Sequence, residues 1–181
     1  MKMLIASDLH GSSKCIKKLI ERVNVEKPDR IVLLGDILYH GPRNGLPEEY
    51  DTQEAAKLLN QKAEMITCVR GNCDSEVDQM LLDFIIEVPH MILSDGGLNI
   101  FITHGHHYNT GHLPPMNNID IILHGHTHVP VCEEITSGKY YMNPGSVSIP
   151  KGGSDHSYMI YDNRTFYWKD LDGKTYMEKK I

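Results

Sequence analysis

Histidines, aspartates and an asparagine in this chain stand where they could bind metal ions. The sequence contains eleven histidines, and seven of them fall between positions 104 and 128. A scattered histidine is usually a surface or capping residue, whereas imidazoles gathered beside acidic and amide side chains are typical of metal sites. The chemistry to look for is therefore metal binding and the hydrolysis that bound metals support.

Each of five apolar runs, expected as buried strands, is followed by a side chain that can bind a metal. The runs and their followers are Met3–Ser7 with Asp8 and His10, Arg30–Leu34 with Asp36, Met65–Val69 with Asn72, Leu98–Thr103 with His104, and Ile119–Leu123 with His126 and His128. In open α/β sheets, ligands bind beyond the carboxyl ends of the strands. We therefore expect these seven side chains to meet at one place.

Each of these features has a simpler explanation when taken alone. An aspartate after a strand often caps the next helix, and Gly35-Asp36 and Gly71-Asn72 are both typical of turns. The segment His124–His128 is harder to explain in this way, because it holds three imidazoles in five residues and its spacing points His126 and His128 in the same direction. The joint occurrence of all five features favours a metal site.

The elements that must position these side chains differ between the two halves of the chain. In the first half, helices expected at Gly11–Asn24 and Thr52–Lys62 alternate with three strands, which predicts a parallel sheet with right-handed crossovers. The second half reads as strands with short turns. Beyond those named above, they are Phe84–Leu93, Val129–Thr136, Lys139–Asn143, Tyr158–Tyr161 and Thr165–Lys169. We expect two packed sheets flanked by helices, in one domain spanning residues 1–181.

Composition narrows the classes of function. With 18 basic against 24 acidic residues the formal charge is −6, which argues against a protein that grips extended nucleic acid. No apolar run approaches the ~20 residues that span a bilayer, and the N-terminal apolar run is too short for a signal peptide. The four cysteines form no CxxC pair. We therefore expect reduced thiols and a cytoplasmic location.

Taken together, the motifs resemble the signature of the calcineurin-like metallophosphoesterase family. They are D-L-H (Asp8–His10), G-D (Gly35-Asp36), G-N-C-D (Gly71–Asp74), T-H-G-H (Thr103–His106) and G-H-T-H (Gly125–His128), in the family's order between Met3 and about Lys151. Three longer segments, His40–Asn44, Arg70–Met80 and Asn143–Gly153, are most similar to the YfcE-type bacterial phosphodiesterases of that family.

The resemblance implies a four-layered α/β/β/α sandwich with a centre of two divalent metals. Asp8, His10 and His128 would hold one metal, Asn72, His104 and His126 the other, and Asp36 would bridge them. Imidazole, carboxylate and carboxamide ligands without thiolate suit Mn²⁺, our first choice, and also Zn²⁺, Fe or Ni²⁺. Such a pair can activate a shared water to attack phosphorus.

The chain departs from the family pattern at Cys73, where much of the family has the histidine credited with protonating the leaving group. A thiol with an ordinary pKa of ~8.5 is a poor acid near neutrality, so we assign no catalytic residue beyond the metal centre. Cys73 and Arg43 are candidate substrate contacts, although an arginine in a long loop is equally often only solvated. Asn143–Ser146 is expected as a turn beneath the metal-binding loops.

The leading hypothesis is a metal-dependent phosphodiesterase that acts on a small-molecule phosphate ester. An alternative of another class is a non-catalytic interaction scaffold, like the retromer subunit that shares this fold. The complete set of seven competent side chains favours the enzyme, while the loss of the proton-donating histidine favours the scaffold. A nuclease is disfavoured by the acidic charge. We expect no membrane association, and a homo-oligomer is left open.

Overall fold

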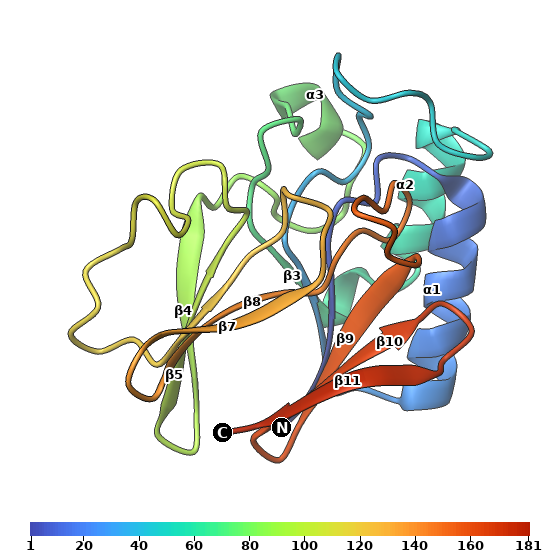
Figure 1. The fold of residues 1–181 in the computed structure, drawn as a ribbon. Coiled ribbons are helices and arrows are strands. Elements are labelled where there is room, and N and C mark those ends of the chain that lie inside the picture. Colours follow the sequence, from blue (N-terminus) through green and yellow to red (C-terminus); the bar gives the residue numbers. More distant parts are fainter.

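The computed structural model describes residues 1–181, and it alternates strands and helices before it turns to strands alone. The first part comprises β1 (Lys2–Ala6), α1 (Ser13–Glu26), β2 (Arg30–Leu33), α2 (Thr52–Asn60), the short 3-10 helix η1 (Ala63–Met65), β3 (Ile66–Cys68) and α3 (Glu76–Gln79). The second part comprises β4 (His90–Asp95), β5 (Leu98–Thr103), β6 (Ile121–Leu123), β7 (Val131–Thr136), β8 (Lys139–Asn143), β9 (Ser157–Asp162), β10 (Thr165–Asp170) and β11 (Thr175–Lys180). Figure 1 shows the arrangement.

The strands form two mixed sheets. One has six strands in the order β11-β10-β9-β1-β2-β3, and the other has five in the order β4-β5-β6-β8-β7. Within the first sheet β1, β2 and β3 are parallel, and within the second β5, β6 and β8 are parallel. The carboxyl ends of each parallel trio therefore lie at one edge of their sheet. The loops that leave these ends carry all seven candidate metal-binding side chains.

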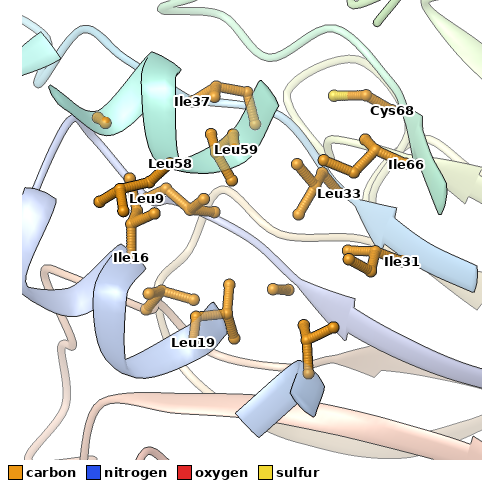
Figure 2. Close-up of a cluster of buried hydrophobic side chains, with 14 of the residues drawn as sticks. Leu9, Ile16, Leu19, Ile31, Leu33, Ile37, Leu58, Leu59, Ile66 and Cys68 are labelled. Atoms are coloured by element: carbon orange, nitrogen blue, oxygen red, sulfur yellow. The ribbon is translucent and has the colours of Figure 1, made fainter. Parts of the chain in front are cut away.

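One hydrophobic core lies between the first sheet and its two long helices. Ile16 and Leu19 of α1 and Leu58 and Leu59 of α2 belong to this core together with Leu33 of β2 (Figure 2). Helix α1 begins where the Ser12 side chain accepts a hydrogen bond from the Cys15 N–H at 3.3 Å. The apolar face of the helix and the cap at its start fix how the chain leaves β1, and so fix the loop that carries Asp8 and His10.

A second core lies between the two sheets. Along β1, Met3 and Ile5 belong to this core, whereas Leu4 and Ala6 belong to the core under the helices, as the two-residue period of a strand requires. From the other sheet, Ile100, Ile102, Ile121, Leu123 and Met142 contribute to the core between the sheets. The indole N–H of Trp168 also donates a hydrogen bond to the carbonyl of Asn143 at 2.7 Å. This bond ties β10 to the end of β8, so the sheets are held in register near the site.

The outer face of the second sheet is covered by the segment 104–120. Tyr108, Leu113 and Met116 pack there against buried Phe101 and Ile122. The segment contains Pro114-Pro115 and forms turns instead of a helix, because proline lacks the N–H that an interior helical position needs. The expected α/β fold of two packed sheets with helices is confirmed, with turns as the layer over this face.

Several element boundaries differ from those expected. The strand expected at Phe84–Leu93 begins only at His90, since Pro89 cannot donate to a ladder and Phe84 and Ile86 instead enter the core under the helices. The structure adds α3 and β11, which the sequence analysis did not include. None of the helices is both long and apolar enough to cross a bilayer.

Candidate metal centre

Five of the seven candidate metal-binding residues have left-handed backbone conformations. Their φ angles are 55° for Asp8, 45° for His10, 55° for Asp36, 68° for His126 and 62° for His128. A residue with a Cβ adopts this region at a cost, and such residues concentrate at functional sites. Backbone hydrogen bonds to the loop after β2 compensate, among them Asp8 N–H to the Gly35 carbonyl at 3.1 Å and His10 N–H to the Asp36 carbonyl at 3.0 Å.

Three of the histidines are anchored through Nδ1 to backbone carbonyls. His10 bonds to the Tyr39 carbonyl at 2.8 Å, His104 to that of Leu34 at 2.7 Å, and His128 to that of Ile149 at 2.6 Å. A carbonyl can only accept, so Nδ1 of each ring carries the hydrogen. This second contact fixes the tautomer and aims Nε2 into the site, as in the histidine ligands of metals.

Asp8, His10 and His128 form what we call the inner donor set. The Nε2 atoms of His10 and His128 lie 3.3 Å apart, and they lie 3.8 and 3.4 Å from Oδ1 of Asp8. Burial lowers the pKa of both histidines, that of His128 to about 4, so both rings are neutral at pH 7. Three lone pairs therefore face one another, and the buried Asp8 Oδ1 has no hydrogen-bond partner. A cation between them would satisfy all three.

Asn72, His104 and His126 form the outer donor set. Nε2 of His104 lies 3.1 Å from Oδ1 of Asn72 and 3.3 Å from Nδ1 of His126. Asp36 stands between the sets, because its Oδ2 lies 3.4 Å from Nε2 of His104 and 3.8 Å from Nε2 of His10. The structure thus brings together all seven side chains selected from the sequence.

The protonation of this cluster also fits a site built for positive charge. Burial raises the pKa of Asp8 above its usual range. Burial alone would lower the pKa of His104, but the contact with Asp36 outweighs it and raises that pKa to about 9. Burial alone would raise the pKa of Asp36, but the contact with His104 and the hydrogen bond from the Cys73 N–H together hold it well below its usual range. The proton on His104 therefore occupies the position of positive charge that a metal cation would take. The donor set fits divalent cations.

The third imidazole of the His124–His128 segment does not face the site. His124 stacks on Tyr141 with ring centroids 3.7 Å apart, and its Nδ1 lies 2.9 Å from the Gly125 carbonyl. Burial lowers the pKa of His124 to about 3, so it remains a neutral packing residue. The density of histidines in the sequence indicated correctly that this segment belongs to the site. It did not distinguish the two donors, His126 and His128, from the packing residue His124.

Several supporting residues lay outside the sequence-based set. The Asp74 carboxylate accepts hydrogen bonds from the N–H groups of Asp36 at 2.9 Å, Ile37 at 2.7 Å and Gly71 at 2.7 Å, so it holds two donor loops together. Asp74 could have been selected from the sequence, because it is the last residue of the G-N-C-D motif. The hydroxyl of Ser146 donates to the Asp8 carbonyl at 2.8 Å, which confirms that the Asn143–Ser146 turn lies beneath the metal-binding loops.

A pocket of about 380 Å³ opens beside the outer donor set. Arg43, Cys73 and Lys151 line it together with Asp36, Asn72 and the loop from His126 to His128. Burial, followed by the charge of Asp36, raises the pKa of Cys73 to about 12, so its thiol is a still weaker acid than the ordinary value suggests. Arg43 and Cys73 were expected at this place from the sequence, whereas Lys151 was not.

Comparisons with known proteins agree with this geometry. Residues 1–165 match the calcineurin-like phosphoesterase superfamily domain. Over 163 residues the chain is 46% identical to Phosphodiesterase YfcE of Escherichia coli strain K12, covering 90% of this chain and 88% of that protein. The solved structure of YfcE, a phosphoesterase from E. coli, superposes with a TM-score of 0.95 at 42% identity over 100% of both chains.

More distant structures share the architecture. Vacuolar Protein Sorting 29 from Cryptosporidium parvum aligns with 99% of this chain and 98% of its own, with a TM-score of 0.65 and 20% identity. At that identity the similarity shows the fold and nothing about activity. The family match over residues 1–165 and the 46% identity together carry the assignment: the chain belongs to the calcineurin-like phosphoesterase superfamily and is a hydrolase of phosphate esters.

Proposed function

We propose that this enzyme is a phosphodiesterase whose centre holds two divalent cations. The observation that carries the proposal is the inner donor set, in which two neutral imidazoles and an unpartnered buried carboxylate oxygen converge. Buried lone pairs that face each other without a hydrogen between them are costly unless a cation joins them. In the outer donor set, Nε2 of His104 lies 3.4 Å from the shared carboxylate of Asp36, where a cation would replace the proton of His104.

In this proposal Asp8, His10 and His128 hold one cation, Asn72, His104 and His126 hold the other, and Asp36 bridges them. The donors are nitrogen and oxygen atoms without a thiolate, a set that suits Mn²⁺, Fe, Ni²⁺ or Zn²⁺. The Cys73 thiol lies close to His10 and Asp36 but is not among the proposed donors. Mn²⁺ is the ion we propose, since four imidazoles, two carboxylates and one carboxamide differ from the thiolate ligands typical of structural zinc.

Two cations held close together supply a water of lowered pKa and positive charge for the phosphoryl oxygens. The chain's own residues position the ester for this chemistry. The carbonyls of Tyr39, Leu34 and Ile149 hold the three anchored imidazoles in one tautomer and one orientation. The guanidinium of Arg43 lines the pocket and can bind an anionic oxygen of the substrate. The Cys73 thiol, with a pKa of about 12, gives no proton to the leaving oxygen.

The substrate that we propose is a small diester. The relative at 46% identity carries the name phosphodiesterase, which supports this class of ester. A pocket of about 380 Å³ lies in the range of small-molecule sites and is too confined for a nucleic acid duplex. All four cysteines are free thiols, which fits the reducing cytoplasm that we propose as its location.

The alternative of a non-catalytic scaffold has less support. A scaffold needs neither buried donors with fixed tautomers nor a pocket beside them, and this chain has both. Strained backbone at five donor positions is also hard to explain in a protein that uses only its surface.

A reconstitution experiment tests the proposal. Metal-free protein is loaded with Mn²⁺, its metal content is measured, and it is assayed against phosphodiesters, monoesters, cyclic nucleotides and dinucleotides. We expect two ions per chain and hydrolysis of diesters that depends on them. A protein that binds two ions and cleaves none of these esters would overturn the catalytic proposal and favour the scaffold.

A further inference from the structure

Two cationic side chains line the pocket without an anionic partner. Neither Arg43 nor Lys151 forms an ion pair with a carboxylate. The ion pairs of this chain that involve its N-terminus, a lysine or an arginine are formed by other residues. Asp36, which belongs to the metal centre, is the one acidic residue among the eleven that line the pocket. The pocket of this acidic chain, with 24 acidic residues against 18 basic ones, therefore holds two cations and one carboxylate.

Both cations extend from anchored backbone. The Lys151 N–H donates to the carbonyl of His128 at 3.1 Å, and the Lys151 carbonyl accepts from the hydroxyl of Ser154 at 2.7 Å. On the facing loop, the Asn44 side chain donates to the His40 carbonyl at 2.8 Å and closes the turn that holds Arg43. The backbone at both positions is therefore held in place, while the two side chains themselves are exposed.

The turn with Arg43 is seated directly on the metal centre. Gly41 has a φ of +79°, and a Cβ at this position would lie 2.8 Å from Sγ of Cys73. Glycine is therefore required both by the backbone conformation and by the close approach. Arg43 and Lys151 line the same pocket as Asn72 and His126, which places both cations beside the outer donor set.

The remaining lining is polar. Pro42 and Cys73 are the apolar residues of the lining, and no phenylalanine, tyrosine or tryptophan lines the pocket, so no such ring is available to stack on a nucleobase. The volume of about 380 Å³ exceeds what a single phosphate fills. The centre itself can neutralise the phosphate that is cleaved, so Arg43 and Lys151 supply positive charge beyond that requirement.

We propose that the substrate is a compact, polar phosphodiester with a second anionic group, which Arg43 and Lys151 bind beside the ester that is cleaved. The inference rests on the proposed phosphodiesterase activity and adds the class of substrate to it. Lys151 is then a specificity-determining residue, and it acts with Arg43 on the part of the substrate that does not react.

Two matched diesters test the proposal because they share one leaving group. Ethyl para-nitrophenyl phosphate and sulfoethyl para-nitrophenyl phosphate differ only in the second anion. We expect the Mn²⁺-loaded enzyme to have a kcat/KM about tenfold higher for the sulfoethyl ester, as two weak and solvent-screened pairs would give. Calorimetric Kd values for the unreactive ethylphosphonate and sulfoethylphosphonate give the same comparison without turnover.

Variants assign the preference to the two cations. Lys151→Gln and Arg43→Gln should each reduce the ratio of kcat/KM values about two- to fivefold, and the double variant should abolish it. Lys151→Glu should make the ethyl ester, which lacks the second anion, the better substrate. The matched control is Lys17→Gln, since Lys17 is exposed on α1 away from the pocket, and it should change neither rate.

The outcomes separate this inference from the proposed function. Hydrolysis of both esters without preference, or a preference that survives in the double variant, would overturn the second-anion proposal and leave the phosphodiesterase intact. Hydrolysis of neither ester with two ions bound would overturn the phosphodiesterase. In that event the two phosphonates still decide the binding question, because equal Kd values would also exclude the second anionic group.

Discussion

The two donor sets differ most in their access to solvent. In the inner donor set the three side chains are closed off, with Asp8 and His10 0% exposed and His128 2% exposed. In the outer donor set only His104 is fully buried, while His126 is half-buried and Asn72 is exposed at the pocket. The chain thus builds one site that is sealed and another that faces the space where a substrate would enter.

This difference follows from where each donor lies in the fold. The loop after β1 lies over Ser146, whose hydroxyl bonds the Asp8 carbonyl, and it is covered by the loop that carries Asp36. In the loop after β3, Cys73 is covered by Gly41, but the neighbouring Asn72 is exposed and lines the pocket. Burial should make the inner ion slow to exchange, whereas the outer ion should exchange readily and take part in substrate binding.

The largest expected effect is that of a change shared by both sites. Asp36→Asn keeps the shape of the side chain but removes the charge that faces both His104 and His10. We expect turnover to fall by at least ~10³-fold, with both ions weakened, whereas His10→Ala should empty mainly the inner site. Metal content and turnover measured on both variants decide this. Equal and near-wild-type turnover would contradict a shared bridging carboxylate.

The next effect concerns the leaving group at the open side of the centre. Since Cys73 gives no proton, wild-type rates should depend steeply on the pKa of the leaving alcohol, and aryl diesters should be cleaved far faster than alkyl diesters. Cys73→His should raise the rate for alkyl esters by about 10²-fold, the lower limit of typical general acid catalysis, and should change aryl esters much less. A series of diesters assayed with both proteins measures the two slopes, and parallel slopes would contradict the prediction.

A smaller effect is expected from pH, and it should separate the two sites. The raised pKa of His104, about 9, means that the outer ion must displace a proton at neutral pH, so its affinity should rise about tenfold per pH unit from pH 7 to pH 9. The lowered pKa values of His10 and His128 keep both imidazoles free to bind below pH 7, whereas burial raises the pKa of Asp8 to about 7. The inner ion must therefore displace a proton from Asp8 only below about pH 7, so it should be released at lower pH than the outer ion. Equilibrium dialysis between pH 5 and pH 9 tests this order of release. Metal content that stays unchanged at pH 5 would contradict ligation by His104.

The sequence predicted the place of the site better than its support. Apolar runs end at polar donors, and parallel strands bring those ends together, so Asp8, Asp36 and His104 could be placed from local patterns alone. The role of Lys151 depends on loops that meet only in the folded chain, so no local pattern reveals it. Asp74 is part of the G-N-C-D motif, but its contact with the loop of Asp36 also appears only in the folded chain. Helix α3 was within reach, because Ser75 and Asp78 form a capping box that can be read directly from the sequence.

The strand boundaries failed for a related reason. Phe84 and Ile86 are apolar enough for a strand, yet they are buried as irregular chain because Pro89 delays the ladder until His90. β11 is charged and mostly exposed, and it forms because the turn after β10 brings it alongside that strand at the edge of the first sheet. A pattern of hydrophobic residues gives no sign of such a strand.

The smallest expected effect is that of Cys73→Ala. The thiol accepts a hydrogen bond from the Asn72 side chain at 3.2 Å, and it lies under Gly41, so it packs the open side of the centre without carrying charge. Removing it takes away one weak contact of an outer donor and leaves the Cys73 N–H bond to Asp36, at 2.8 Å, in place. We expect turnover of aryl diesters to change by no more than about threefold, since the contact is that of a neutral thiol.

Cys73→Ser is the matched control for Cys73→Ala, because it restores a polar group of similar size. It should resemble both wild type and Cys73→Ala in turnover, and all three should bind two ions. The same pair also tests the exposed character of the outer donor set: release of the outer ion to a chelator should be slightly faster in Cys73→Ala, and release of the inner ion should not change. Should Cys73→Ala abolish turnover while both ions remain bound, the thiol takes part in the chemistry, and the open side of the centre is itself catalytic.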